Sequence, residues 1–313
     1  MSIHTILGAG GVIGNGLAKE LIQHKETVRL VSRHPIAMDG ASTMAADLTD
    51  PAQTLEAVRG SSIVHLCVGL KYDYSVWRQQ WPRIITNTIE ACKQTQAKLI
   101  FFDNVYMYGL VDGGMTEDTP YNPCSRKGDL RARLATQLMS EVRKGNITAT
   151  IARAADFYGP GADKTSIPNL LVMQRLAKGL KPQWMVNRDV RHSFTFTEDA
   201  IKALYILARD EESWNQVWHL PTATDPLTGS EFISQAAQAI GRSTQSTVLS
   251  KWMIRLGGLF DKTTAELYEM AYQYQYDYLF DSSKFEKAYD FEPTTYEAGI
   301  KATAHAYKDN IGR

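Results

Sequence analysis

The first half of the chain alternates short apolar runs with longer segments in which apolar residues recur every three or four positions. IHTIL (residues 3–7) and ETVRLVS (residues 26–32) have the length of strands, and GLAKELIQH between them has helical spacing. Parallel strands need a crossover of about a helix's length, so this order predicts a Rossmann-like, doubly wound parallel sheet of the α/β class. Further strands are expected at residues 42–47, 61–70, 97–104 and 147–154, and further helices from Pro51, over 77–96 and after Pro123.

The pattern changes after Gly161. SIPNLLVMQRLAKG and EDAIKALYILAR predict helices, HSFTFT and QVWHLP predict strands, and the chain from about residue 223 is mostly helical. In the tyrosine-rich tail, apolar residues at helical spacing favour a core face over a pocket wall, namely Leu267, Met270, Ala271 and Tyr274. We expect a nucleotide-binding domain at residues 1–165, completed by about 190–222, and a smaller, mostly helical substrate lobe at 166–189 and 223–313.

Composition limits the classes of partner. Apolar residues make up 44% of the 313 positions, charged residues 22%, and the formal net charge is zero, so nucleic acid and acidic membranes are poor candidates. Cys67, Cys92 and Cys124 show neither paired nor metal-like spacing, which suits a reducing compartment. No signal peptide and no apolar run of about 20 residues is evident. These features predict a soluble, cytoplasmic protein without a metal site.

The glycine-rich stretch GAGGVIG follows the first predicted strand and opens the first helix. Gly8, Gly10 and Gly11 would allow a tight turn and close approach to a pyrophosphate, and Gly14 would bring the helix against the strand. A helix N-terminus also offers unpaired N–H groups to phosphate. A dinucleotide site is therefore expected here, with a simple packing turn as the alternative. The expected contacts are Gly8, Gly10, Gly11, Val12, Ile13 and Gly14.

The end of the second predicted strand bears on the choice between NAD and NADP. NAD-binding proteins usually place an acid there for the ribose 2′-hydroxyl. This chain has LVSRHP, with Ser32 and Arg33 at the corresponding place. A guanidinium suits a 2′-phosphate, and a charge-assisted hydrogen bond of roughly 1.5–3 kcal/mol predicts a preference for NADP(H). A solvated arginine at a strand end is the alternative.

Several segments together resemble the extended short-chain dehydrogenase/reductases, the NAD(P)-dependent epimerase/dehydratase group. They are the GxxGxxG spacing of Gly8, Gly11 and Gly14, ADL (46–48), VYMYG (105–109), ARAADFYGPGA (152–162), FTFTEDA (194–200) and FDSSKFEKAYDFEP (280–293). The resemblance implies that Asp47 and Leu48 lie near the adenine. It also implies that the loop after the fourth strand passes the nicotinamide, with Cys67, Val68 and Gly69 beside the cofactor.

The resemblance also suggests a substrate pocket. Tyr72 and Tyr74 would form its wall, and Arg191 and His192 lie near the usual place of an arginine for a sugar nucleotide's diphosphate. Tyr158, from the YGPG turn, and Asp103, at the end of a predicted strand, complete the expected pocket residues. Asp103 and Asn104 stand at a strand's carboxyl end, where sites in such sheets lie. A buried Asp103 would need a partner such as Lys127 or Arg131.

The sequence departs from the family pattern at the catalytic positions, because the YxxxK motif is missing. Asn104 stands where the family has serine or threonine, Cys124 where it has the tyrosine, and Gly128 where it has the lysine. Lys127 is one position away and, in a helix starting after Pro123, would share a face with Cys124. Either Cys124, its pKa lowered by the helix N-terminus and by Lys127, replaces the acid, or it is a small buried filler.

Phenols are alternative acids. Tyr106, Tyr108 and Tyr121 are close in sequence to the missing tyrosine, with aromatic packing as the other explanation. The site could thus support an atypical NADP-dependent oxidoreductase acting on a small carbonyl, hydroxyl or sugar-like compound. A non-catalytic NADP-binding sensor and a nucleotide-sugar isomerase or dehydratase with transient cofactor use are the alternatives. The resemblance also allows a homodimer through two helices, whose apolar positions include Ile85, Ile89, Leu134 and Leu138.

Overall fold

The computed structural model describes residues 2–311, with side chains as far as Lys308. The chain forms two compact units, each assembled from three separate segments. Unit 1 comprises Met1–Met107, Lys127–Arg153 and Ala200–Trp218, and unit 2 comprises Tyr108–Arg126, Ala154–Asp199 and His219–Arg313. The expected division into cofactor and substrate regions concerns ligands, so it stays a prediction.

Unit 1 is built on a seven-stranded sheet with the order β11-β7-β5-β4-β1-β2-β3. The pairings of β1 with β2 and β4, of β2 with β3, and of β5 with β4 and β7 are all parallel. The predicted α/β doubly wound sheet is therefore confirmed. The strands are β1 (Ile3–Leu7), β2 (Thr27–Ser32), β3 (Ala41–Ala45), β4 (Ile63–Leu66), β5 (Lys98–Asp103), β7 (Ala149–Arg153) and β11 (Val217–His219).

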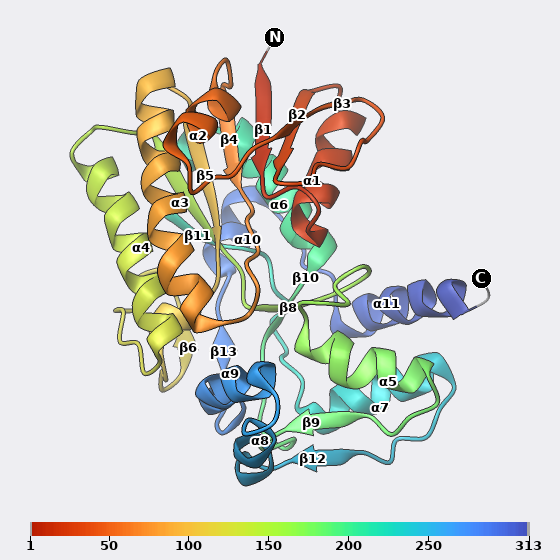
Figure 1. Cartoon of the computed structure of the whole chain (residues 1–313). Helices are drawn as coiled ribbons and strands as arrows, with labels where there is room; N and C mark the ends of the chain where they lie inside the picture. The colour runs from red at the N-terminus through yellow and green to blue at the C-terminus, as the bar shows by residue number, and fades with distance from the viewer. Residues whose placement is uncertain (1, 312–313) are drawn as a thin grey trace. The chain divides into compact units, whose positions relative to one another are not determined.

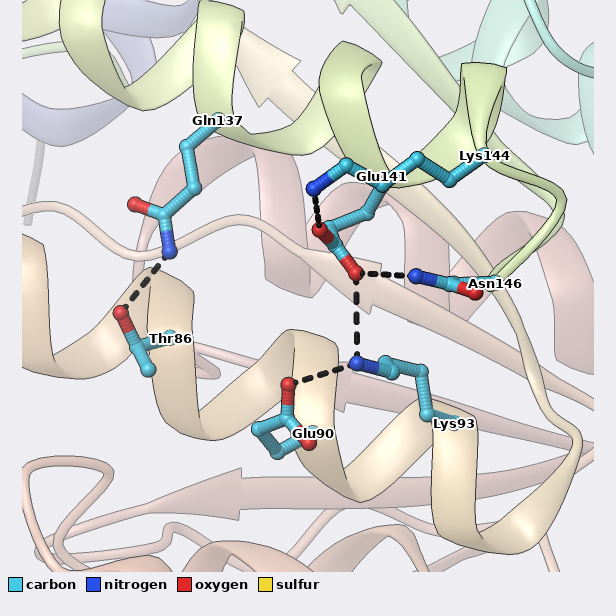
Figure 2. Close-up of polar contacts among 7 residues, drawn as sticks. All are labelled: Thr86, Glu90, Lys93, Gln137, Glu141, Lys144 and Asn146. Carbon is cyan, nitrogen blue, oxygen red and sulfur yellow. Dashed lines mark hydrogen bonds and ion pairs between the residues drawn. The ribbon is translucent and has the colours of Figure 1, made fainter.

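Helices lie on both sides of this sheet (Figure 1). On one side α1 packs so closely on α6 that a Cβ added at Gly16 would lie 2.1 Å from Ile201 Cδ1. On the other, Gln137 of α4 donates to Thr86 of α3 at 3.0 Å, and Lys93 bonds Glu141 at 3.2 Å (Figure 2). The helices are α1 (Val12–Gln23), α2 (Pro51–Val58), α3 (Tyr74–Thr95), α4 (Arg126–Arg143) and α6 (Thr197–Arg209).

The apolar residues expected at a dimer interface belong to the interior of unit 1. The relative exposures are 0% for Ile85, 1% for Ile89, 2% for Leu134 and 0% for Leu138. These four side chains do not supply the intersubunit surface that the sequence allowed, because the periodic apolar faces of α3 and α4 are already buried within the chain. Exposed positions of α4 carry an ion pair instead, Arg133–Asp129. A homodimer remains a prediction that needs other residues.

The helices predicted over 77–96 and 166–179 differ from the sequence expectation. α3 begins at Tyr74, ahead of the expected residue 77, because the Asp73 side chain accepts a hydrogen bond from Ser75 N–H and caps the helix. The predicted helix over 166–179 contains a π-helical segment (Asn169–Met173) before α5 (Gln174–Ala177). Asn169 is buried there and its amide donates to the carbonyl of Gly159 at 2.8 Å, which ties the segment to the preceding turn.

Unit 2 combines helices with three two-stranded pairs, β8–β10, β9–β12 and β6–β13. Its core includes the buried aromatic residues Tyr158, Trp184, Phe194, Phe232 and Tyr274. The strands are β6 (Gly114–Met115), β8 (Asp156–Tyr158), β9 (Gln183–Met185), β10 (Phe194–Phe196), β12 (Thr247–Leu249) and β13 (Leu279–Phe280). The helices after residue 223 are α7 (Gly229–Ile240), α8 (Lys251–Gly257), α9 (Lys262–Met270), α10 (Ser283–Tyr289) and α11 (Tyr296–Ile311).

The tail residues expected in a core are buried, as Met270, Ala271 and Tyr274 are each at most 2% exposed. Leu267 is partly buried and packs against the same cluster. Across residues 2–311, no helix combines the length and the apolar character that crossing a membrane would require.

Candidate functional site

The glycine loop joins β1 to α1 in a conformation that only glycine fits. Gly8 has φ +98° and lies so close to the neighbouring loop that a Cβ would be 2.6 Å from Val68 Cα. No heavy atom lies within 4 Å of a Cβ built on Gly10, and the nearest to one on Gly11 is 3.9 Å away. The loop is therefore packed on the inside and open on the outside, as a cradle for a bulky anion requires.

The start of α1 is suited to phosphate. Gly11 is its N-cap and has no side chain to bond the first-turn N–H groups, and the first turn carries no acidic residue. These N–H groups and the positive end of the helix dipole favour a negative group outside Gly10 and Gly11. A nicotinamide dinucleotide, through its pyrophosphate, fits this cradle. Val12 is partly exposed at the mouth, whereas Ile13 and Gly14 are buried in the packing of the helix.

Arg33 and Asp47 lie beyond the ends of β2 and β3, which pair as far as Ser32 and Ala45. Arg33 is exposed, and Asp47 accepts two hydrogen bonds from Thr49, from N–H at 2.9 Å and from Oγ1 at 2.8 Å. These bonds, with a smaller contribution from the charge of Arg33, lower the pKa of Asp47. Two groups thus stand at adjacent strand ends. The guanidinium of Arg33 can bind a phosphate, and the carboxylate of Asp47 is a fixed hydrogen-bond acceptor. Leu48 beside them is buried.

Lys127 is completely buried in the first turn of α4, and its Nζ lies 4.7 Å from the centroid of the Tyr72 ring. Tyr72 belongs to the loop after β4, and its hydroxyl lies 3.5 Å from the hydroxyl of Tyr106. Trp77 packs against both phenols, edge-on to Tyr72 at 5.7 Å and stacked with Tyr106 at 6.4 Å. Two phenols and one buried cation therefore meet within unit 1.

Asp103 is the last residue of β5, and Asn104, which follows it, bonds the backbone of Tyr106. Asn104 Oδ1 accepts the N–H of Tyr106 at 3.1 Å, so its amide nitrogen is the group that could donate to a substrate oxygen. Asp103 is 2% exposed and accepts from Asn104 N–H, Arg131 and Arg153. Both carboxylate oxygens thus have donors inside the protein, and this arrangement favours a role as internal counter-ion over substrate contact.

Comparison with known families decides the affiliation. Residues 4–219 match the description "NAD dependent epimerase/dehydratase family". The chain belongs to this family. The resemblance inferred from its motifs is therefore confirmed. A search of curated protein sequences finds no match to the chain.

Solved structures of the same fold span the whole chain. UDP-glucose 4-epimerase from Thermus thermophilus, in complex with NAD, is 16% identical with a TM-score of 0.79, covering 98% of this chain and 99% of its own. The Thermotoga maritima UDP-glucose 4-epimerase, with UDP-glucose, is 16% identical with a TM-score of 0.81, covering 99% and 100%. The dTDP-glucose 4,6-dehydratase from Bacillus anthracis, in complex with NAD, is 13% identical with a TM-score of 0.81, covering 100% and 98%. At these identities the likeness shows the fold alone.

Cys124, which stands at the position of the family's tyrosine, was expected in the helix after Pro123, and the structure differs from this expectation. α4 begins at Arg126, so Cys124 lies in the preceding loop and not in the helix, and it is exposed. Partial desolvation raises its thiol pKa, against the lowering expected from a helix N-terminus. The predictions of a helix face shared with Lys127, of an activated thiol and of a buried filler are therefore wrong.

The remaining phenol candidates lie in unit 2. Tyr108 is completely buried, and its hydroxyl lies 2.6 Å from Nε2 of His219. Asp281 O lies 2.8 Å from Nδ1 of that ring, so a proton on Nδ1 would leave Nε2 to accept from the phenol. Tyr121 packs edge-on to Tyr108 at 5.9 Å. These contacts give Tyr108 an internal hydrogen-bond partner.

The expected diphosphate residues, also in unit 2, have internal partners as well. The guanidinium of Arg191 donates to Asp277 at 2.9 and 2.6 Å. His192 is 1% exposed, and its ring is stacked between Phe194 at 4.4 Å and Tyr274 at 4.6 Å. Tyr158 is 1% exposed within the same core. The structure therefore favours packing roles for His192 and Tyr158, whereas Arg191 stays at the surface.

Of the other expected contacts, Ser32 is partly exposed at the end of β2, and Gly69 is exposed in the loop after β4. Cys67 and Val68 precede Gly69, and burial raises the pKa of the Cys67 thiol to about 12, which leaves it a packing group beneath the glycine loop. Tyr74 is the first residue of α3.

The partnership of Arg153 with Asp103 is the main site feature that sequence reasoning missed. β5 pairs with β7 in a register that places Asp103 directly opposite Arg153. The sequence carried a signal for it, since FFD and IAR end the two predicted strands with opposite charges.

Proposed function

We propose that this chain is an NADP-dependent enzyme that acts on a sugar-like compound by an epimerase- or dehydratase-type reaction, with transient use of the cofactor. The observation that carries the proposal is the cluster of Lys127, Tyr72 and Tyr106 in the unit that bears the glycine cradle. Family membership, and the nucleotide-sugar enzymes among the structures of the same fold, favour this reaction over the net oxidoreduction expected first.

The chain's own groups would hold the dinucleotide in three places. Gly10, Gly11 and the first N–H groups of α1 would receive the pyrophosphate, and Asp47 would lie beside the adenosine. Arg33, exposed after a strand without a terminal acid, would bind a 2′-phosphate and give NADP its advantage. The bound nicotinamide supplies a hydride acceptor and donor.

The remaining residues would manage the substrate oxygen. The amide nitrogen of Asn104 would donate a hydrogen bond to it and orient it, because Oδ1 of that amide is engaged by Tyr106 N–H. A phenol from the Tyr72–Tyr106 pair would take the proton from the hydroxyl or return it. Asp103 would offset part of the positive charge of Arg131 and Arg153, to which it is bonded.

The test is an assay of the purified full chain with NADP or NAD and a panel of UDP- and dTDP-sugars, read by product analysis and nicotinamide absorbance together. We expect a rearranged or dehydrated sugar with no net change in reduced cofactor. Stoichiometric consumption of NADPH with a carbonyl compound would instead establish a net oxidoreductase. Tight cofactor binding without turnover of any compound would overturn the enzyme proposal and favour a sensor.

A further inference from the structure

Lys127 is in an unusual position for a lysine. Its side chain has 0% relative exposure, although burying an ammonium group is costly unless charge or hydrogen-bonding partners compensate. Its Nζ lies 4.7 Å from the Tyr72 ring centroid, a cation–π distance. Gly128 and Leu130, which follow it in α4, are also buried. The cation is thus fixed against one particular phenol.

Tyr72 is fixed from the other direction by its own loop. Trp77, 7% exposed, donates its indole N–H to the carbonyl of Lys71 at 3.0 Å, which anchors the residue before Tyr72. Asp73, the residue after it, caps α3 through Ser75. A side chain whose two chain neighbours are tied down is pre-organised, as a proton-transfer group needs to be. Tyr72 remains partly exposed, so a ligand can reach it.

Tyr106 supplies a second hydroxyl. It lies 3.5 Å from that of Tyr72, and the ring of Tyr106 is stacked on Trp77. Small movements would bring the two hydroxyls into a good hydrogen bond, across which a proton could be shared. The backbone N–H of Tyr106 also holds Asn104, so the pair and the proposed substrate-orienting amide are mechanically linked.

We propose that Tyr72 is the proton-transfer residue of this site, with Lys127 stabilising the negative charge on its oxygen and Tyr106 sharing the proton. This assignment rests on the proposed function above. The family places a tyrosine and a lysine four residues apart on one helix. Here the phenol comes from the loop after β4 and the ammonium from α4. The tyrosine–lysine partnership would thus be rebuilt from two segments of the chain.

The proton step balances simply. In the oxidising step the substrate O–H bond would break and its proton would pass to the phenolate oxygen of Tyr72, while a bound nicotinamide would supply the acceptor for the hydride that leaves the carbon as the carbonyl forms. In the return step the phenol O–H bond would break and the proton would go back to the carbonyl oxygen, with the hydride returned to the carbon by the same nicotinamide. Tyr72 ends as it began, and no further oxidant or reductant is needed.

The first experiment compares Tyr72→Phe, Tyr106→Phe and the matched control Tyr205→Phe, a tyrosine stacked on His24 in the same unit. We expect Tyr72→Phe to lower kcat by about 10²- to 10⁴-fold with the dissociation constant of NADP unchanged. Tyr106→Phe should lower kcat less, and Tyr205→Phe should leave it unchanged. Full activity in Tyr72→Phe, or an equal loss in the control, would overturn the assignment.

A second readout does not depend on turnover. Phenolate absorbance is titrated for the unmutated protein, for Tyr72→Phe and for Lys127→Met, and the Tyr72 signal is obtained by difference. The charged and titratable groups beside Tyr72 include Lys127 from α4, Tyr106 after β5, and its chain neighbours Lys71 and Asp73. Removing the ammonium should move the Tyr72 transition to higher pH, and Lys127→Arg should restore it in part.

An unmoved transition in a folded Lys127→Met variant would contradict the role of Lys127. If that variant does not fold, Lys127→Gln serves the same comparison. If the unmutated chain turns over no sugar nucleotide, the proposed function fails. The titration then still decides whether Lys127 controls the ionisation of Tyr72, so the two failures remain distinguishable.

Discussion

Arg131 donates from Nε to Oδ1 of Asp103 at 2.8 Å, and both side chains are almost completely buried. The guanidinium also lies over the rings of Trp81 at 4.5 Å and Phe101 at 4.9 Å. Arg153 approaches the other carboxylate oxygen at 3.3 Å. Two buried guanidinium groups therefore share one carboxylate at the carboxyl end of β5.

We expect Asp103→Asn to lower the free energy of unfolding by about 3–5 kcal/mol, because it removes a buried carboxylate that two buried guanidinium groups share. Urea unfolding followed by circular dichroism measures the change. The control is Asp129→Asn, whose carboxylate pairs with exposed Arg133 at 2.7 Å and should matter little. Equal effects of the two substitutions would show that the buried network does not stabilise the fold.

Arg33 should determine the choice of dinucleotide. If its guanidinium binds the 2′-phosphate, Arg33→Ala should narrow the NADP-over-NAD preference by about ten- to hundredfold. Titration calorimetry with both dinucleotides gives the ratio, and His34→Ala, an exposed neighbour, is the matched control. Equal affinities for NADP and NAD in the unmutated protein would rule out the preference.

Two glycines of the cradle should respond differently to a methyl group. Gly8→Ala should lower stability by about 1–3 kcal/mol, because φ is +98° and the new Cβ would lie 2.6 Å from Val68 Cα. Gly11→Ala should leave stability nearly unchanged, since φ is −82° and the nearest atom is 3.9 Å away.

The expected loss in Gly11→Ala is cofactor affinity, because the methyl group would occupy the outer surface of the cradle. Thermal unfolding with and without NADP separates the two effects. A Gly11→Ala protein that NADP stabilises as fully as the unmutated chain would contradict phosphate binding at this loop.

A buried histidine pair should make stability depend on pH. His4 Nδ1 and His65 Nε2 lie 3.1 Å apart, and burial lowers the pKa of His4 and lowers that of His65 well below its ordinary value. Below about pH 6.5 the unfolded chain takes up protons at these residues and the folded chain does not. Stability should therefore fall with decreasing pH in this range, by at most about 1.4 kcal/mol per pH unit for each histidine.

Urea unfolding at a series of pH values between about 7.5 and 5 tests this. His65→Phe should flatten the dependence, because the variant has no imidazole to protonate at that position. His34→Gln, a substitution at an exposed histidine, should keep the slope of the unmutated protein. Identical slopes in all three proteins would show that His65 takes up the same number of protons in the folded and in the unfolded state, which would contradict the prediction.

The sequence by itself determined the alternating strands and helices, the glycine cradle and the family. These depend on local features: apolar spacing identifies each element, and the loop from Gly8 to Gly14 carries its conformation in its own residues. It also indicated Arg131 as a partner for Asp103, since buried carboxylates need cations.

Only the tertiary structure decided which side chains meet. Arg131 and Arg153 lie 28 and 50 residues from the carboxylate they share, and Tyr106 lies 34 residues from Tyr72. The tertiary structure also showed that Cys124 precedes α4 and that Ile85 is buried inside the unit. Spacing alone could not give either result, since the start of a helix depends on its cap and burial depends on packing. Spacing along the chain cannot fix such contacts, since they follow from the path of the loops between strands. The meeting of Lys127 with Tyr72 is of this kind.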